Sequence, residues 1–547
     1  MSSPSSQGLA SPNPASFATS VAQAHDTPRF DWSAPGIPLI ALAATIWFVA
    51  AMWVMRFHQL DDALITLRYA EQLDRTRRLT FNGNIQSYGV SSLLYVGIVA
   101  SVYAFWQSVF VTKVLSVIFY ALTCIVVTRE ASRAPAGPAR TLWWWTLAVL
   151  LSPTAMRWLS DGMETSLTAL AALIVTRAAY TCADGLEPRR HYLAMAALGA
   201  AAILLRLEFC AIIGCATGAI LLSRWESAGR PGLGAATKIA LPESHLAVGG
   251  ILALAAIRLG LGQTIPDTAI AKSVPGMAFT FTQYKYYVTV FAGAFSLGIG
   301  LPLIWIISAI AVCRVSRGIR LVSIAIVNAS FPILILAALE RGQIIQIRYF
   351  VAPLLFMVAW NLFALADATR GRPAARAPAH RRRFAIAAAV VVCVFTAESM
   401  AVHRIIRDRS QVLLAMRAQH LDLLADKRGM AWDIGFISYF SHAQLCDMAG
   451  LTGGRAWAQD QPGNRAKICA AWSPDFVFLN PEQIGFVTDY MALDSMLVCH
   501  QYRFQNMLTT ESHYLLVKPE IASELCPDAS SAAPLIRTAR AEAASRQ

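Results

Sequence analysis

Long apolar runs separated by short polar segments occupy most of the chain between residues 38 and 402. A run of about 20 apolar residues can cross a bilayer as a helix. Such runs lie at 38–55, 111–128, 141–159, 163–181, 191–205, 208–223, 241–261, 286–313, 319–339, 349–367 and 384–402. A further apolar stretch, 92–107, is short. The pattern predicts an all-α polytopic membrane bundle with about eleven transmembrane helices.

The arginines between the runs predict the topology. Cytoplasmic loops of membrane proteins carry an excess of Lys and Arg. If 92–107 does not cross, the basic segments all fall on one side: Arg129/Arg133/Arg140, Arg189/Arg190, Arg224/Arg230/Lys238, Arg314/Arg317/Arg320 and 370–383. We therefore expect 92–107 to be an interfacial or re-entrant helix, with the N-terminus inside and the C-terminal region outside.

The two ends of the chain differ from the bundle. Residues 1–34 are rich in Ser, Pro and Ala, which predicts a disordered cytoplasmic tail before a transmembrane domain at 35–402. The remaining segment, 403–547, has the size of an ordinary soluble domain. Its strand-like runs at 428–434, 476–479 and 514–517, with helical patterns between them, predict an extracytoplasmic α/β domain.

Composition supports the membrane class. The chain is 56% hydrophobic and 14% charged, whereas soluble domains carry about 25% charged residues. A net charge of +13 would suit a nucleic-acid partner, but no basic stripe is interleaved with stacking aromatics. Membrane lipids, and not nucleic acid, are the expected surroundings.

Four cysteines, Cys446, Cys469, Cys499 and Cys526, lie in the expected outer domain. An oxidising compartment would allow them to form disulfides. Four cysteines permit three pairings, and the sequence does not choose among them.

Two adjacent carboxylates, Asp61 and Asp62, follow the first apolar run. Such groups at a bilayer surface are costly, so they are candidates for a general base. Neighbouring residues on a helix point about 100° apart, so the pair is not expected to share one proton. We expect one to face the reaction and the other to cap the helix or to pair with Arg68. The alternative is two capping aspartates at the start of a helix running through Glu71.

A long local motif surrounds this pair. It consists of Asp61-Asp62-Ala63-Leu64-Ile65-Thr66-Leu67-Arg68-Tyr69, Phe81-Asn82-Gly83 and Tyr88-Gly89-Val90-Ser91-Ser92-Leu93-Leu94-Tyr95. It resembles the first external loop, here 57–110, of GT-C membrane glycosyltransferases. Within that superfamily it looks most like the family of the terminal arabinofuranosyltransferase of actinobacterial cell walls, whose enzymes use polyprenyl-phosphate sugars.

Shorter blocks continue the resemblance. They are Asp161-Gly162-Met163-Glu164-Thr165, Arg206-Leu207-Glu208, Pro266-Asp267-Thr268-Ala269-Ile270-Ala271-Lys272, Arg348-Tyr349-Phe350, Trp432-Asp433-Ile434-Gly435 and Asp447-Met448-Ala449-Gly450-Leu451. In two places the chain departs from the family pattern, with Leu207 in place of a proline and Asp267 in place of an asparagine. The roles of the 206–208 turn and of Asp267 therefore stay open.

The resemblance implies an enzyme of the outer face of the bacterial cytoplasmic membrane. It would move a sugar from a polyprenyl-phosphate donor to a hydroxyl of a cell-envelope glycan, lipid or protein. An acidic residue of the first external loop would act as the base, here Asp61 or Asp62, with Asp61 favoured. This fits the general requirement for a carboxylate within reach of the incoming hydroxyl.

Cations must also hold the departing phosphate. The candidates for binding the donor phosphate or the substrate are Arg68, Tyr88, Glu164, Arg206, Glu208, Lys272, Arg341, Arg348 and Tyr349. Arg206 has a structural alternative, an ion pair with Glu208 or Glu164, and Arg341 and Arg348 have another, reaching toward the interface. Whether a divalent metal binds is open, because no tight carboxylate motif is present.

The alternative function is a transporter or flippase of a lipid-linked or anionic solute, since many spans with arginines fit that class too. Against it, the charged residues gather at one surface, and the two halves of the chain do not repeat. A non-catalytic scaffold for an envelope complex is a third hypothesis.

Overall fold

The computed structural model describes residues 37–83, 85–183, 191–229, 244–273, 300–340, 347–370, 380–505 and 510–546. The chain divides into two compact units, Met1–Ile46 and Trp47–Gln547. The contacts described below all lie within the second unit.

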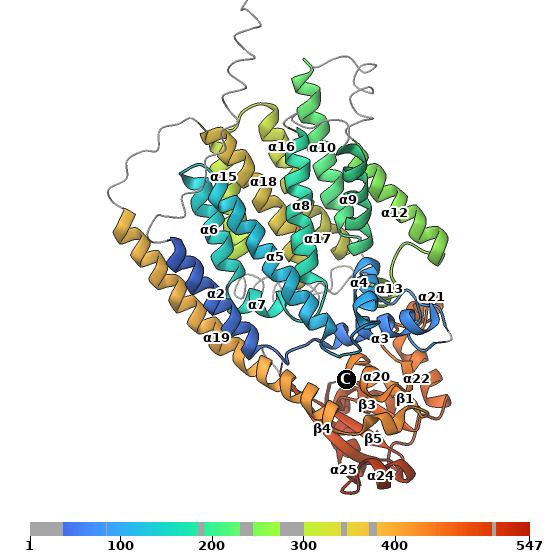
Figure 1. Ribbon diagram of the computed structural model, residues 1–547. Helices are drawn as coiled ribbons and strands as arrows, with labels where there is room; N and C mark the ends of the chain where they lie inside the picture. Colours follow the sequence, from blue (N-terminus) through green and yellow to red (C-terminus); the bar gives the residue numbers. More distant parts are fainter. Residues whose placement is uncertain are drawn as a thin grey trace, which may run out of the picture. The chain divides into compact units, whose positions relative to one another are not determined.

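Apolar helices form the first part of the described chain (Figure 1). They are α2 (Ile37–Val54), α4 (Leu93–Tyr103), α5 (Val111–Arg133), α6 (Pro138–Leu150), α7 (Pro153–Leu159), α8 (Thr165–Ala183), α9 (His191–Leu205), α10 (Phe209–Ser227), α12 (His245–Leu261), α15 (Gly300–Val315), α16 (Ile319–Asn328), α17 (Ser330–Glu340), α18 (Val351–Thr369) and α19 (His380–Ala418). Five stretches are long and apolar enough to cross a membrane: Val111–Arg133, Thr165–Ala183, Phe209–Ser227, Ile319–Ala337 and Arg348–Thr369. The helical membrane class is confirmed at this level, and the number of eleven crossings stays a prediction.

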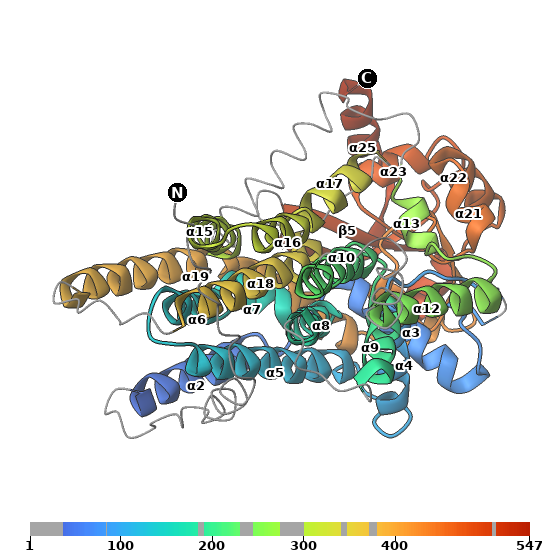
Figure 2. The same ribbon diagram turned by 90° about the horizontal axis from the view of Figure 1, so that it is seen from above.

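Helix α8 is the centre of the bundle. It packs against α5, α10 and α18, which surround it in the view of Figure 2. Its buried face carries small residues, among them Ser166, Ala169, Ala172 and Ala179. Small side chains let helices approach closely, and in a membrane such packing replaces the hydrophobic effect as the main source of association.

Two predicted runs are interrupted in the structure. The run 141–159 divides into α6 and α7 because Pro153 cannot continue a helix and instead starts a new one, whose first turn Ser152 caps by accepting the Ala155 N–H. The run 319–339 divides at Ala329, between α16 and α17. The short stretch at 92–107 forms the 11-residue helix α4, and its expected interfacial or re-entrant position stays a prediction.

The C-terminal part is an α/β unit built on a six-stranded sheet of order β2-β1-β3-β5-β4-β6. The strands are β1 (Arg428–Ala431), β2 (Gln444–Asp447), β3 (Phe476–Leu479), β4 (Leu497–Gln505), β5 (Thr510–Val517) and β6 (Ser530–Ser531). β1 pairs in parallel with β2 and β3, whereas β5 is antiparallel to β3 and β4, and β4 to β6. The strand-like runs recognised in the sequence correspond to β1, β3 and β5.

Short helices precede, separate and follow these strands in the chain. They are η3 (Leu421–Leu424), α20 (Gly435–Ser441), α21 (Arg455–Gln459), α22 (Pro462–Ala471), α23 (Pro481–Val487), α24 (Pro519–Leu525) and α25 (Ala533–Arg546). The expected domain boundary at residue 402 falls inside α19, a continuous helix of 39 residues. The bundle therefore leads into the α/β unit without a break in the helix.

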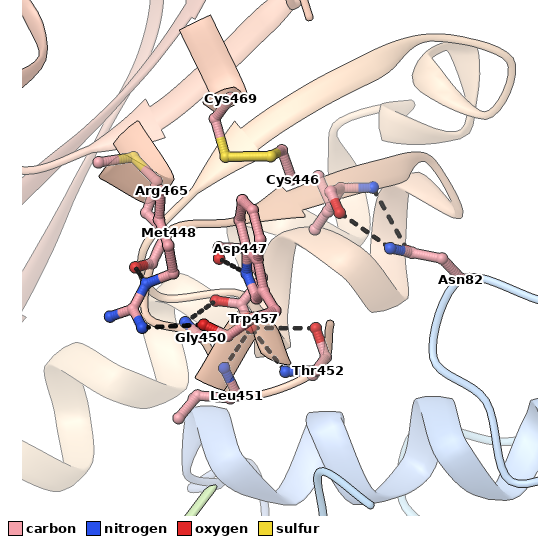
Figure 3. The surroundings of a disulfide bond; sticks show 11 residues. Asn82, Cys446, Asp447, Met448, Gly450, Leu451, Thr452, Trp457, Arg465 and Cys469 are labelled. Carbon is pink, nitrogen blue, oxygen red and sulfur yellow. Dashed lines mark hydrogen bonds between the residues drawn. A yellow bond between two sulfur atoms is a disulfide. The ribbon is translucent and has the colours of Figure 1, made fainter. Parts of the chain in front are cut away.

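Two disulfides decide the pairing that the sequence left open. Cys446 is bonded to Cys469, and Cys499 to Cys526. The first joins β2 to α22, as Figure 3 shows. Disulfides persist in oxidising compartments, and the extracytoplasmic location of the α/β unit stays a prediction.

Strand β2, which carries the first disulfide cysteine, contacts the loop that follows α3 (Asp61–Thr76). The Asn82 amide donates to the Leu445 carbonyl at 2.9 Å and accepts the Leu445 N–H at 3.4 Å (Figure 3). Asp447 accepts the N–H groups of Leu451 and Thr452 at 2.6 and 2.8 Å, which closes a tight turn. The two bonds between Asn82 and Leu445 connect the α/β unit to the first loop.

Candidate functional site

Asp61 links the first loop to the α/β unit. Its carboxylate accepts the Gly435 N–H at 2.9 Å and the Phe436 N–H at 2.7 Å, at the start of α20. The alternative that both aspartates cap their own helix is wrong, because α3 has Leu60 as N-cap, without a side-chain cap bond. A Cβ on Gly435 would lie 2.0 Å from the Asp61 backbone oxygen, so this approach requires glycine.

The surroundings of Asp61 favour its protonated form. Burial raises the pKa of the Asp61 carboxyl to about 7, and the negative charges of Asp433 and Asp62 act in the same direction. The two backbone N–H groups oppose this rise because they stabilise the charged form. A carboxyl with this pKa exchanges protons near neutral pH, which is what a general base requires.

Asp62 points to a different set of partners. Its carboxylate pairs with the guanidinium of Arg348, and the Lys272 ammonium lies 4.0 Å away. Burial alone would raise the pKa of the Asp62 carboxyl, but the positive charges of Lys272 and Arg348 hold it well below its usual value. Asp62 and Lys272 keep 28% and 26% of their side chains exposed, whereas Arg348 keeps 3%. Two cations thus converge on one accessible carboxylate.

Arg206 is neutralised by two carboxylates. It donates to Glu164 at 2.7 Å and to Glu208 at 3.1 Å, so the structural alternative considered for Arg206 is the arrangement found. Glu164 also accepts the Ser91 hydroxyl at 2.9 Å. The Arg206 guanidinium lies 4.4 Å from the centre of the Tyr349 ring, and Arg348 lies 5.4 Å from the same ring.

These contacts join most of the predicted residues into one group. Tyr349 connects Arg206 and its carboxylates to Arg348, and Arg348 connects to Asp62 and Lys272. Helices α8, α10 and α18 begin beside this group, directly after Glu164, Glu208 and Phe350. Helix N-termini carry a partial positive charge, which favours an anion at this end of the bundle.

Asp267 fixes the segment that carries Lys272. Its carboxylate accepts the Tyr88 N–H at 2.8 Å and the Gln263 amide at 2.6 Å, and its own N–H donates to the Tyr88 carbonyl at 2.7 Å. The short helix α13 (Asp267–Ala271) ends next to Lys272. Asp267 therefore ties α13, and Lys272 with it, to the first loop, while Tyr88 lies buried at the same junction.

One predicted residue with described contacts, Arg68, lies apart from this group. Arg68 does not pair with Asp62. It donates to Glu71 at 2.8 Å and contacts His442 at 3.1 Å, within the junction with the α/β unit. Arg341 lies outside the described residues.

Three residues near Asp61 were not assigned a role from the sequence. Arg409, on α19, interacts electrostatically with Asp61, Asp433 and Asp62. Asp433 contacts His513 on β5, with 2.6 Å between Oδ2 and Nε2. The sequence offered a reason to consider Arg409, because it is an arginine on the predicted outer side, against the positive-inside bias. The sequence pointed to Asp433 only as part of the block 432–435, and it gave no reason to consider His513.

No group of three or more His, Cys, Asp and Glu side chains suited to a metal ion occurs in the described ranges. Glu164 and Glu208, two carboxylates of the candidate site, both bind Arg206.

The fold and these contacts define a class: a helical membrane-type bundle with an α/β unit bonded to its first loop, and charged residues gathered at one end. No family model and no curated protein matches the chain. Among solved structures it is similar to the crystal structure of ArnT from Cupriavidus metallidurans bound to undecaprenyl phosphate. The TM-score is 0.50 and the identity 12%, over 91% of this chain and 99% of that chain. At this identity the likeness is one of fold.

Proposed function

We propose that the chain is a GT-C glycosyltransferase that moves a sugar from a polyprenyl-phosphate donor to a hydroxyl of a cell-envelope glycan, lipid or protein at the outer face of the cytoplasmic membrane. The observation that carries the proposal is the convergence of Arg348 and Lys272 on Asp62, next to the half-buried carboxyl of Asp61. The fold shared with a protein that binds undecaprenyl phosphate supports it.

The proposed reaction is a single displacement. The acceptor oxygen forms a bond to the anomeric carbon while its proton passes to Asp61. The bond between that carbon and the phosphate oxygen breaks, and its electron pair stays on the phosphate. Arg348 and Lys272 stabilise the charge that develops there, since preorganised cations act most strongly on charge that appears in the transition state.

In this proposal Asp62 acts on the cations rather than on the acceptor. Before the donor binds, its carboxylate neutralises Arg348 and Lys272 and holds them near each other. The donor phosphate then replaces Asp62 as their main partner, because a phosphate offers more acceptor oxygens and charge than one carboxylate. The guanidinium groups of Arg348 and Arg206 both lie over the Tyr349 ring, and this packing helps to hold Arg348 in place.

A transfer assay tests the proposed function. Purified protein in lipid nanodiscs is incubated with radiolabelled polyprenyl-phosphate sugar and a cell-envelope extract. We expect labelled glycan, lipid or protein, with release of unlabelled polyprenyl phosphate. Intact labelled donor that only moves across the bilayer of proteoliposomes would instead identify a flippase.

Close docking of α20 on α3 is expected to matter for activity. The Gly435→Ala variant places a methyl group against the Asp61 backbone and should push α20 away from the carboxylate. Misplacement of a catalytic group by about 1 Å can cost on the order of 100-fold in rate, so we expect transfer to fall by ~10- to 100-fold. The rate of sugar transfer per mole of folded protein measures this effect.

Gly97→Ala on α4 is the matched control, because a Cβ at Gly97 has no neighbour within 4 Å. It should transfer at the wild-type rate. Equal rates for Gly435→Ala and Gly97→Ala would contradict a role for the α3–α20 contact.

A further inference from the structure

The α/β unit brings a second carboxylate to Asp61. Asp433 lies two residues before Gly435, whose N–H is bonded to the Asp61 carboxylate. Its charge acts on Asp61 more strongly than that of the neighbouring Asp62. The side chain of Asp433 keeps 45% of its surface exposed, so only a specific contact can hold it in one orientation.

His513 provides that contact. Its Nε2 lies 2.6 Å from Asp433 Oδ2, and because an ionised carboxylate only accepts, the ring nitrogen is the donor. The histidine is 3% exposed. Its ring stacks on Phe478, with centroids 5.4 Å apart, and meets Phe504 edge to face at 4.7 Å. A side chain packed on two faces has little freedom to turn, so the position of Asp433 is fixed as well.

The same aromatic cluster holds the start of α20. Phe436, whose N–H donates to Asp61, is fully buried and packs on Phe504 at 5.9 Å between ring centroids. Phe504 therefore contacts both the residue that binds Asp61 and the histidine that orients Asp433. One rigid unit thus presents two hydrogen-bond donors and one negative charge to Asp61.

We propose that Asp433, oriented by His513, is a positioning residue through which the α/β unit keeps Asp61 basic enough to accept the proton of the acceptor hydroxyl. The proposal rests on the proposed function, in which Asp61 is the base. A carboxylate at its ordinary pKa of about 4 is a weak base at neutral pH, whereas a nearby negative charge strengthens it. The opposing charge is Arg409 on α19, which interacts with Asp61, Asp62 and Asp433 together.

The sign of the expected pH dependence follows from these charges. Transfer requires ionised Asp61, so the rate falls as the pH drops through the pKa of Asp61, near 7 in the wild type. Asp433→Asn removes a negative charge, which lowers the pKa of Asp61. The acid limb of the pH profile of kcat should then move to lower pH, while the rate on the plateau falls because the base is weaker.

The test compares four variants with the wild type. His513→Gln keeps an N–H donor for Asp433 and should keep the wild-type acid limb, whereas His513→Phe removes the donor and should move the limb in the direction of Asp433→Asn. Asp494→Asn, an exposed carboxylate of the same unit, should leave the profile unchanged. An acid limb that stays in place in Asp433→Asn, with transfer retained, overturns the proposal.

An infrared titration separates this proposal from the proposed function. The carbonyl band of a protonated carboxyl that is present in the wild type and absent from Asp61→Asn reports the ionisation of Asp61 without any turnover. Its midpoint should lie near pH 7 in the wild type and lower in Asp433→Asn. Equal midpoints refute the role of Asp433 even if the protein transfers no sugar, while absent transfer with shifted midpoints refutes only the glycosyltransferase assignment.

Discussion

Replacing Asp61 by asparagine is expected to lower kcat for sugar transfer by about 10²- to 10⁴-fold, the usual contribution of a general base. Asparagine cannot take the proton of the acceptor hydroxyl. Its amide also presents N–H groups to one of the two α20 donors that Asp61 now accepts, so part of the loss comes from docking. The measurement is kcat at saturating donor and acceptor, with the affinity for polyprenyl phosphate determined in parallel.

Two comparisons separate the two contributions. The Gly435→Ala variant disturbs docking but keeps the Asp61 carboxyl. The part of the rate loss in Asp61→Asn that exceeds the loss in Gly435→Ala therefore comes from removal of the base. Formate added to Asp61→Gly should restore part of the rate by supplying a carboxylate, and Asp74→Asn, on the same helix α3, should behave as wild type. Full activity in Asp61→Asn together with an inactive Asp62→Asn would move the base to Asp62.

Replacing Arg348 or Lys272 by glutamine is expected to weaken the binding of undecaprenyl phosphate by ~10- to 100-fold each. A hydrogen bond to a charged group contributes about 1.5–3 kcal/mol, and each 1.4 kcal/mol corresponds to about a factor of ten in affinity. The effect should be larger for Arg348, which is buried and contacts Asp62 directly, than for the more exposed Lys272. Calorimetric titration of nanodisc-embedded protein with the lipid phosphate measures it.

The Asp62→Asn substitution should have the opposite effect on the affinity for undecaprenyl phosphate. Without the carboxylate, Arg348 and Lys272 lose their resident partner, so the lipid phosphate should bind at least as tightly as in the wild type. Arg370→Gln is the matched control for Arg348→Gln, because Arg370 follows the other end of α18 and its side chain is 76% exposed. If Asp62→Asn weakened binding as much as Arg348→Gln, Asp62 would be part of the donor site rather than a competitor for its cations.

Several residues of the local motifs contact one another in the structure, but the motifs did not predict the partner of each side chain. Asp61 and Asp62 are consecutive, and the helical turn predicts that they diverge. Only the fold places α20 next to one and Arg348 next to the other, from residues more than 280 positions away in the chain. The sequence left two roles open for Arg206, binding of the donor phosphate and an ion pair with Glu208 or Glu164. The structure shows that it contacts both carboxylates.

Residues that act through tertiary contacts were the hardest to recognise. A buried histidine such as His513 has no periodicity or motif that distinguishes it from a core residue. Its contact with Asp433 depends on β5 lying beside β3 in the sheet. The disulfide pairing has the same cause, since three arrangements satisfy the cysteine count and only the packing of β2 on α22 selects Cys446–Cys469.

The sequence by itself determined the membrane character, the α/β nature of the C-terminal part and the short polar blocks that carry charge, because these depend on local composition and periodicity. The tertiary structure decided which charges meet, since electrostatic and hydrogen-bonding partners are separated by hundreds of residues and their energies fall off within a few ångströms. Where α6 ends and α7 begins was encoded locally, by Ser152 and Pro153. Where Asp61 finds its hydrogen bonds was not, because the donors lie in a different part of the chain.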